Sequence, residues 1–288
     1  MTMELRHLRA FLAIAEEGSI TRAAARLHTG QPALSRTLRQ LETRLGVRLV
    51  DRSTHHLGLT AAGRTFRDRA AAALAAADAA FDPRSLSAAR PLRLGHPWAA
   101  LGSWTVPLLR RWDQEHPEVP LELRRIDDRT AGLTRGKVDA ALLRGRVAPL
   151  PGMVTELLLE EERVAVVPEG SDLADRATLT LADLATWPVA LNTVAGTTTL
   201  DLWPAGARPP ATLEVANTDE WLTVIAAGRA VGITTSATPG LHSQPALAYR
   251  PLTDAPPVPL VLAWPRDVPA HPAIPALIGL VRDVVAGR

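Results

Sequence analysis

The sequence predicts two parts of different fold class: a mostly helical part over residues 1–90 that ends in a long helix, and a mixed α/β part over residues 91–288. Only two of the 24 prolines lie in the first 90 residues, and all seven tryptophans lie after residue 97. Residues 1–90 carry 14 arginines against 8 acidic residues, whereas the remainder carries 18 basic against 22 acidic residues. A basic segment with few helix breakers indicates helices and a polyanionic partner.

Composition excludes several classes of protein. The chain contains no cysteine, which excludes disulfides, thiolate metal sites, Fe–S clusters and cysteine nucleophiles. No apolar run approaches the roughly 18 residues of a membrane-spanning helix. The first nine residues include Glu4, Arg6 and Arg9 and lack the apolar segment of a signal peptide. We therefore expect a cytoplasmic protein.

Apolar residues at helical spacing predict three short helices, over residues 4–16, 20–27 and 32–45, with Ser19 as the N-cap of the second and Gly46 ending the third. The expected buried stripe of the third helix consists of Leu34, Leu38, Leu41 and Leu45. The opposite face carries Ser35, Arg36, Arg39, Gln40 and Thr43. Such a face is typical of a helix-turn-helix recognition helix, whose polar side chains bind base edges in the major groove. The alternative is the solvated face of an ordinary helical hairpin.

Two short apolar runs, 47–50 and 57–60, predict a β-hairpin wing whose loop can contact phosphate or the minor groove. The loop carries Arg52, His55 and His56. The histidine pair also allows a metal site, but one hairpin tip offers too few ligands. Thr60 is expected to cap a long helix over residues 61–81, in which nine of the eleven residues 70–80 are alanine. This helix is either a plain spacer or a dimerisation helix.

Four segments of the helical part, residues 11–24 (FLAIAEEGSITRAA), 31–36 (QPALSR), 45–49 (LGVRL) and 59–63 (LTAAG), resemble the LysR-type transcriptional regulators of bacteria. The resemblance implies a winged helix-turn-helix domain over residues 1–60, a linker and dimerisation helix with a hinge over 61–90, and an effector-binding domain over 91–288. It implies a regulator, not an enzyme, that binds promoter DNA as a homodimer or dimer of dimers and responds to a small-molecule effector. RNA polymerase is a further candidate partner, and no cofactor is expected.

The candidate DNA-binding residues are Ser19, Thr21, Arg22, Gln31, Pro32, Ser35, Arg36, Arg39, Arg52, His55 and His56. Three positions depart from the family pattern: Thr29-Gly30 in the turn, Val50-Asp51 before the wing and His55-His56 in the wing. The histidines replace the usual basic residues. We therefore expect weaker wing contacts, or contacts that depend on pH near about 6–7, where histidine titrates.

Alternating strands and helices predict a parallel sheet in the second part, with strands over 92–94, 120–125 and 138–143 and helices over 102–115 and 131–136. Further strands are expected over 164–167, 189–191, 212–215, 231–235 and 260–263, with a helix over 219–227. A last helix, over 273–285, is expected to pack on the first unit. This order is similar to the two-lobed, periplasmic-binding-protein-like effector domain of the family. Lobe 1 is then about 91–163 and 266–288, and lobe 2 about 164–265.

Ligands of α/β sheets bind beyond the carboxyl ends of strands and at helix N-termini. The residues expected at such places are His96, Trp98, Gly102, Ser103, Trp104, Thr130, Arg144, Asn192, Thr193, Asn217 and Thr218. They suit a small anion, such as a carboxylate, with Arg144 as its partner and a tryptophan as an aromatic wall. Six of them have a structural alternative: N-caps for Ser103 and Thr130, a surface ion pair for Arg144, loop bonds for Asn192 and Asn217, and core packing for Trp104.

An enzyme and a solute-binding protein for transport are the two alternatives to a regulator. An enzyme is disfavoured because the sequence contains no nucleophile elbow, P-loop or zincin motif. A solute-binding protein for transport is compatible with residues 91–288, but the basic helical part and the expected lack of a signal peptide argue against it.

Overall fold

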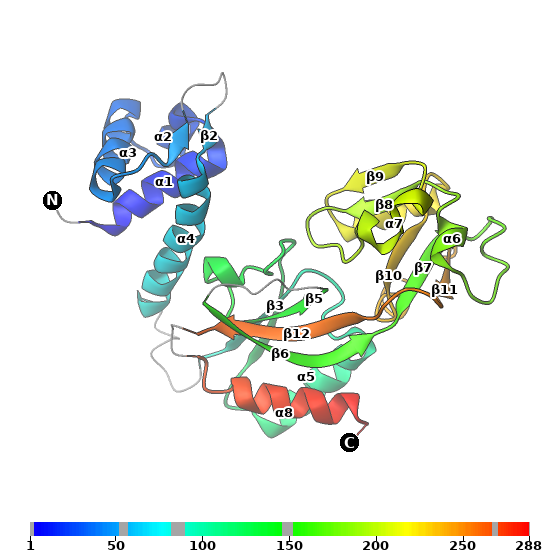
Figure 1. The fold of residues 1–288 in the computed structure, drawn as a ribbon. Coiled ribbons are helices and arrows are strands. Elements are labelled where there is room, and N and C mark those ends of the chain that lie inside the picture. Colours follow the sequence, from blue (N-terminus) through cyan, green and yellow to red (C-terminus); the bar gives the residue numbers. More distant parts are fainter. Residues whose placement is uncertain (1–2, 52–56, 82–89, 146–151, 267–269, 288) are drawn as a thin grey trace. The chain divides into compact units, whose positions relative to one another are not determined.

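The computed structural model describes residues 3–51, 57–81, 90–145, 152–266 and 270–287. These residues form two compact units (Figure 1). The first contains residues 1–90 and 134–137, and the second contains residues 91–133 and 138–288. None of the helices in the described ranges has the length and apolar character needed to cross a membrane.

The first unit consists of four helices and a short hairpin: α1 Leu5–Glu17, α2 Ile20–Arg26, α3 Gln31–Leu45, β1 Val50–Asp51, β2 Gly58–Leu59 and α4 Ala61–Phe81. The predicted helices are confirmed to within about one residue, and α4 has the predicted bounds. Ser19 caps α2 by accepting a hydrogen bond from the Arg22 N–H, and Gly46 ends α3 in the left-handed region at φ 69°. Within the described residues the hairpin pairs only Val50 with Leu59 and Asp51 with Gly58, so less of the predicted runs 47–50 and 57–60 is strand than expected.

The core of the first unit lies between α1, α2, α3 and the start of α4. It contains Phe11, Ile14, Ala23, Ala24, Leu34, Leu38, Leu41 and Leu49. The Glu42 carboxylate of α3 accepts hydrogen bonds from the N–H groups of Leu49 and Val50, at 2.8 and 3.2 Å. The hairpin is thereby fixed to α3. The predicted burial of Leu45 is wrong: it is 38% exposed, because the last turn of α3 extends beyond this core.

A five-stranded sheet of order β4-β3-β5-β12-β6 forms the first lobe of the second unit. Its strands are β3 Leu92–His96, β4 Leu121–Arg125, β5 Ala140–Arg144, β6 Met153–Glu161 and β12 Val258–Pro265. The predicted parallel pairing of β3 with β4 and β5 is confirmed. The predicted membership of residues 260–263 in the second lobe is wrong, because β12 pairs antiparallel with β5 and β6.

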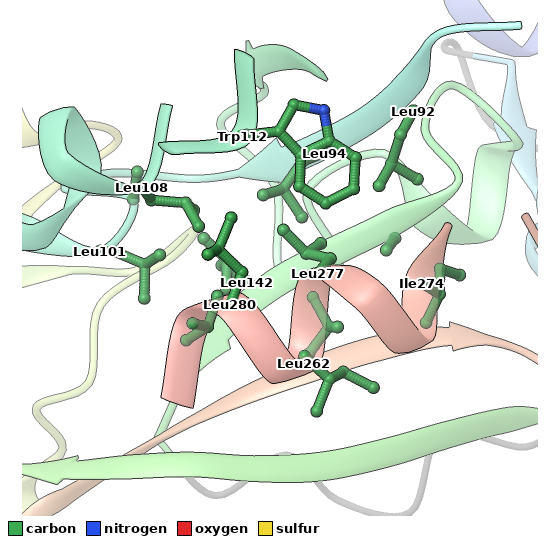
Figure 2. Close-up of a cluster of buried hydrophobic side chains, with 14 of the residues drawn as sticks. Leu92, Leu94, Leu101, Leu108, Trp112, Leu142, Leu262, Ile274, Leu277 and Leu280 are labelled. Carbon is green, nitrogen blue, oxygen red and sulfur yellow. The ribbon is translucent and has the colours of Figure 1, made fainter. Parts of the chain in front are cut away.

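Two helices cover the core of this sheet: α5 Thr105–Glu115 and α8 Ile274–Val285. In Figure 2, Leu277 and Leu280 of α8 lie with Leu94 of β3, Leu142 of β5 and Leu262 of β12, beside Trp112 of α5. The predicted packing of the last helix on the first lobe is thus confirmed. Two predicted helical segments contain 3₁₀ turns instead, Gly102–Trp104 before α5 and Leu133–Arg135 before β5.

The second lobe contains two small sheets. In the first, β7 Arg163–Pro168 lies between β10 Gly232–Thr235 and β11 Leu247–Pro251; in the second, β8 Val189–Asn192 pairs parallel with β9 Thr212–Val215. Its helices are α6 Leu181–Leu184 and α7 Thr218–Ala226, with 3₁₀ turns at Leu200–Leu202 and Ala205–Ala207. Strands β6 and β11 were not predicted. The run 153–161 lacks a clear alternation of apolar and polar residues, because a β-bulge between Leu157 and Leu159 interrupts its pairing with β12.

Candidate nucleic-acid interface and effector pocket

The exposed face of α3 carries Gln31, Pro32, Arg36 and Arg39. Among the described residues, neither arginine forms an ion pair. Ser35 departs from the prediction, because it is only 8% exposed. At 100° per residue it lies beside the leucine stripe, whereas Arg36 and Arg39 lie farther around the helix. The arginines are therefore the accessible candidates for base or phosphate contacts, and Ser35 is less accessible than we expected.

The remaining DNA-binding candidates lie outside this face. Ser19 is the N-cap of α2, and Thr21 is exposed. The Arg22 guanidinium donates a hydrogen bond to the Glu17 carbonyl and lies 3.7 Å from the Glu17 carboxylate. Contact of Arg22 with phosphate would therefore compete with these bonds. Arg52, His55 and His56 lie outside the described residues.

A small pocket lies in the second unit, with a volume of about 30 Å³. Its walls are formed by Trp98, Ala190, Asn192, Gly196, Thr197, Thr198, Thr218, Trp221, Ile233 and Thr234. Trp98 follows a strand of the first lobe, and the other residues belong to the second. The pocket therefore unites three predicted effector residues, Trp98, Asn192 and Thr218, that are far apart in the sequence.

Hydrogen bonds between side chains and the backbone hold the pocket walls in place. The Trp98 indole N–H donates to the Ala195 carbonyl at 3.2 Å, and the Trp221 indole N–H donates to the Ala190 carbonyl at 2.8 Å. The Asn192 carboxamide oxygen accepts from the N–H groups of Val194 and Ala195, both at 3.0 Å. The turn after β8 is thus fixed by Asn192, as its structural alternative predicts.

Asn217 has a structural role that differs from the loop bonds predicted as its alternative. Its side chain caps α7, because the Glu220 N–H donates to its Oδ1 at 2.9 Å. Thr218, the first residue of α7, is buried and lines the pocket. The N-terminus of α7 therefore contributes one pocket wall.

Arg144 does not line the pocket but supports it from behind Trp98. Its Nε and Nη2 atoms donate to Glu161 Oε2 and Oε1 at 2.8 and 2.7 Å, and its Nη1 donates to the Trp98 carbonyl at 3.2 Å. The guanidinium lies 4.7 Å from the centre of a Trp98 ring. Glu161 balances the charge of Arg144. The alternative of an ion pair is therefore correct in kind, but the pair is buried and not on the surface as predicted.

The other predicted effector residues do not line this pocket. Gly102 is buried, Ser103 is exposed, Trp104 packs partly against the first-lobe core, Thr130 binds Asp128 and Thr193 is exposed. His96 Nδ1 is buried without a hydrogen-bond partner among the described residues. Burial lowers the pKa of His96, and the nearby Arg144 and Arg125 lower it further.

Several pocket residues were missed by sequence reasoning. Gly196, Thr197 and Thr198 follow β8, Trp221 lies on α7, and Thr234 lies on β10. The run GTTT at 196–199, a few residues after a predicted strand, was a signal that could have identified this wall. No sequence signal pointed to Trp221 and Thr234, since only the packing of α7 and β10 brings them to the pocket. Within the described ranges, no cluster of three or more metal-ligating side chains is present.

Comparison with known proteins agrees with this arrangement. The family described as "Bacterial regulatory helix-turn-helix protein, lysR family" matches residues 5–64, and "LysR substrate binding domain" matches residues 86–286. The Hca operon transcriptional activator HcaR of Escherichia coli is 30% identical over 99% of both chains. The regulator ShiR of Corynebacterium glutamicum is 34% identical over 87% of this chain and 88% of its own.

Solved structures show the same fold. The LysR family regulator CbnR covers 98% of this chain and 99% of its own at a TM-score of 0.67 and 23% identity. Full-length BenM covers 99% and 97% at a TM-score of 0.56 and 26% identity. The relatives are transcriptional regulators, which confirms the prediction of a regulator over an enzyme. With a helix-turn-helix domain that is followed along the sequence by an effector-binding domain, the chain belongs to the LysR family of bacterial transcriptional regulators.

Proposed function

We propose that this regulator binds promoter DNA through the exposed face of α3, with Arg36 and Arg39 as the main contacts. The observation that carries the proposal is the freedom of these arginines: both are exposed, and neither forms an ion pair within the described residues. Arginine binds guanine edges and phosphates through paired hydrogen bonds. The solved complex of full-length CbnR with its target DNA supports this mode of action.

We assign residues 1–60 to DNA binding, 61–90 to a linker with a hinge, and the rest to effector binding. The alanine-rich side of α4 is proposed to pair with a second copy, because small side chains let two helices approach closely. A dimer, or a dimer of dimers, then contacts repeated half-sites on one face of the duplex. We further propose that the protein acts in the cytoplasm, where its DNA is. RNA polymerase is proposed as a further partner, and no cofactor is proposed.

The effector is proposed to be a small carboxylate or other small anion bound in the pocket between the two lobes. Four threonines and Asn192 line the pocket beside the N-terminus of α7, and no acidic side chain is among its lining residues. Helix N-termini and hydroxyl groups favour anions. Because Glu161 neutralises Arg144, these neutral donors are expected to hold the anion, and Trp98 and Trp221 its apolar part.

Effector binding must change the structure around the pocket. About 30 Å³ holds roughly one or two water molecules, whereas small-molecule sites commonly measure hundreds of Å³. An effector therefore binds a wider form, and its binding energy shifts the population toward that form. Such a shift within the effector-binding domain is the proposed signal to the DNA-binding domain.

Fluorescence anisotropy with DNA from upstream of the regulator's own gene tests the DNA-binding proposal. Replacing Arg36 and Arg39 by alanine together is expected to abolish binding that survives excess competitor DNA. Arg44→Ala, which removes an exposed arginine from another side of α3, is the matched control and should bind normally. Unchanged specific binding by the double variant would overturn the proposal.

The effector proposal is tested on the same complex with a panel of small carboxylates and their uncharged amides. We expect an acid, but not its amide, to alter both anisotropy and tryptophan fluorescence. Thr218→Val should lose this response while binding DNA normally without effector. If the variant responds like the wild type, the effector binds elsewhere.

A further inference from the structure

Arg163 is a buried cation with an incomplete set of partners. It is the first residue of β7 and is 6% exposed. Its Nε donates to the Pro256 carbonyl at 2.8 Å, and its Nη2 donates to the Thr197 carbonyl at 3.1 Å. Its Nη1 is buried without a hydrogen-bond partner, and no carboxylate of the described chain forms an ion pair with it. The guanidinium is therefore bound only by neutral carbonyl oxygens.

Thr235, the residue opposite Arg163 on the neighbouring strand, has a second polar group that is unpartnered within the described chain. Thr235 is the last residue of β10, is fully buried, and its Oγ1 has no hydrogen-bond partner among the described residues. It stands directly opposite Arg163 in the antiparallel pairing of β10 with β7. Directly opposed residues project to the same face of a sheet, with Cβ atoms about 4.5–5.5 Å apart. Arg163 and Thr235, each with a polar atom unpartnered in the part of the chain described, therefore extend from opposite positions on the same face of the sheet.

The surroundings make an unbalanced charge unfavourable. On the same face of these strands, Ala165, Val167 and Ile233 belong to an apolar cluster. Burial lowers the pKa of Arg163, yet an arginine remains protonated in proteins. Glu161, two residues earlier, is already bound to Arg144. A buried charge requires an opposite charge or a full set of hydrogen bonds.

Arg163 lies where the chain passes between the two lobes. The chain crosses from the first lobe to the second between β6 and β7, directly before Arg163, and returns between β11 and β12. The Pro256 carbonyl that Arg163 binds lies on the return segment, and the Thr197 carbonyl belongs to a pocket wall. Arg163 therefore links both crossings to the pocket.

We propose that Arg163 Nη1 and Thr235 Oγ1 bind a compact monovalent anion, separate from the effector pocket, at the crossings between the lobes. A halide ion and the carboxylate of a small acid share the required chemistry, since both accept hydrogen bonds from a guanidinium and a hydroxyl. The bound anion balances the charge of Arg163 and stabilises its bonds to the two segments.

Thermal unfolding of the full-length protein tests the site. The protein is kept in sodium gluconate, whose anion is bulky, and chloride or acetate replaces gluconate at constant ionic strength. We expect a saturable rise of Tm for the wild type. Thr235→Val keeps the side-chain shape, and should weaken the anion's apparent affinity at least about tenfold, the effect of about 1.4 kcal/mol. Arg163→Met should abolish the rise. Thr223→Val, at an exposed threonine of α7, is the matched control.

Crystals grown in bromide locate the anion independently. An anomalous peak within hydrogen-bond distance of Arg163 Nη1 supports the proposal, even if Arg163→Met fails to fold. A response to chloride supports a halide, and a response to acetate alone supports a carboxylate. The proposal is overturned if the Tm of Thr235→Val responds like the wild type, or if chloride raises Tm but bromide binds only elsewhere. It is also overturned if neither anion raises Tm, since water then completes the bonds.

Discussion

The side chains of Arg144 and Glu161 form a two-point ion pair that is almost entirely buried, with 1% and 2% of each side chain exposed. The partners lie at the carboxyl end of β5 and the end of β6, two strands that both pair with β12. Arg144 also holds the Trp98 carbonyl and lies over its indole ring. The pair therefore acts as a support for the pocket wall that Trp98 forms.

Breaking this pair should destabilise the protein strongly. Glu161→Gln leaves a buried guanidinium without its counter-charge, and removal of one partner of a buried pair costs about 3–5 kcal/mol. Urea unfolding measures the loss. Replacing both residues by apolar ones, Arg144→Met with Glu161→Leu, should recover most of it. Asp201→Asn, in an exposed pair with Arg208, should change stability by less than about 1 kcal/mol. Equal effects of Glu161→Gln and Asp201→Asn would contradict the assignment.

His96 should make stability depend on pH. Burial and two arginines lower its pKa in the folded state below the ordinary value of about 6.5. Between these two pKa values the unfolded chain binds more protons, so stability rises with pH and is lost as the pH falls below about 6.5. His96→Gln should lose less free energy of unfolding between pH 7.5 and 5.5 than the wild type.

A second, partly buried histidine, His242, should also contribute to the pH dependence of stability and serves as the comparison for His96. Burial also lowers the pKa of His242, so His242→Gln should reduce the pH dependence as well, and the double variant more than either. Identical losses in the wild type and His96→Gln would show that the imidazole of His96 is not held neutral.

Gly63 should not tolerate a side chain. A Cβ at this position of α4 would lie 2.0 Å from the Leu49 carbonyl oxygen, so helix and hairpin would have to separate. Overpacking of this kind costs about 1–3 kcal/mol. Gly63→Ala is therefore expected to unfold at lower urea concentration. Gly58→Ala, in β2 with open space around it, is the matched control. Wild-type stability of Gly63→Ala would contradict this packing.

Arg36 should contribute to sequence-specific recognition of DNA rather than to nonspecific binding. It lies near the N-terminus of α3, which is the end that reaches base edges in helix-turn-helix proteins. Arg36→Ala should weaken specific binding by about 1–3 kcal/mol and relax specificity at one base pair. Competition assays over single-base variants of the operator measure this. A uniform loss across all sequences, with the salt slope reduced by about 0.9, would identify a phosphate contact instead.

Local signals in the sequence predicted much of the first unit. Thr60 is expected as a cap before an alanine-rich run, and its Oγ1 indeed accepts from the Gly63 N–H at 2.9 Å at the start of α4. Ser19 and Gly46 likewise mark helix ends where predicted. These features involve residues within one or two helical turns, so short-range pattern suffices to predict them.

The sequence by itself determined the family, the helix-turn-helix elements and the alternation of strands and helices, because periodicity, caps and breakers act between neighbours in the chain. Only the tertiary structure decided that β12 joins the first lobe, that Ser35 is buried and that Arg144 pairs with Glu161. Only it brought Trp98, Thr198 and Trp221 to one pocket and placed Thr235 opposite Arg163. The physical reason is that strand pairing and burial depend on partners far away in the sequence, whose choice is made by packing of the whole domain.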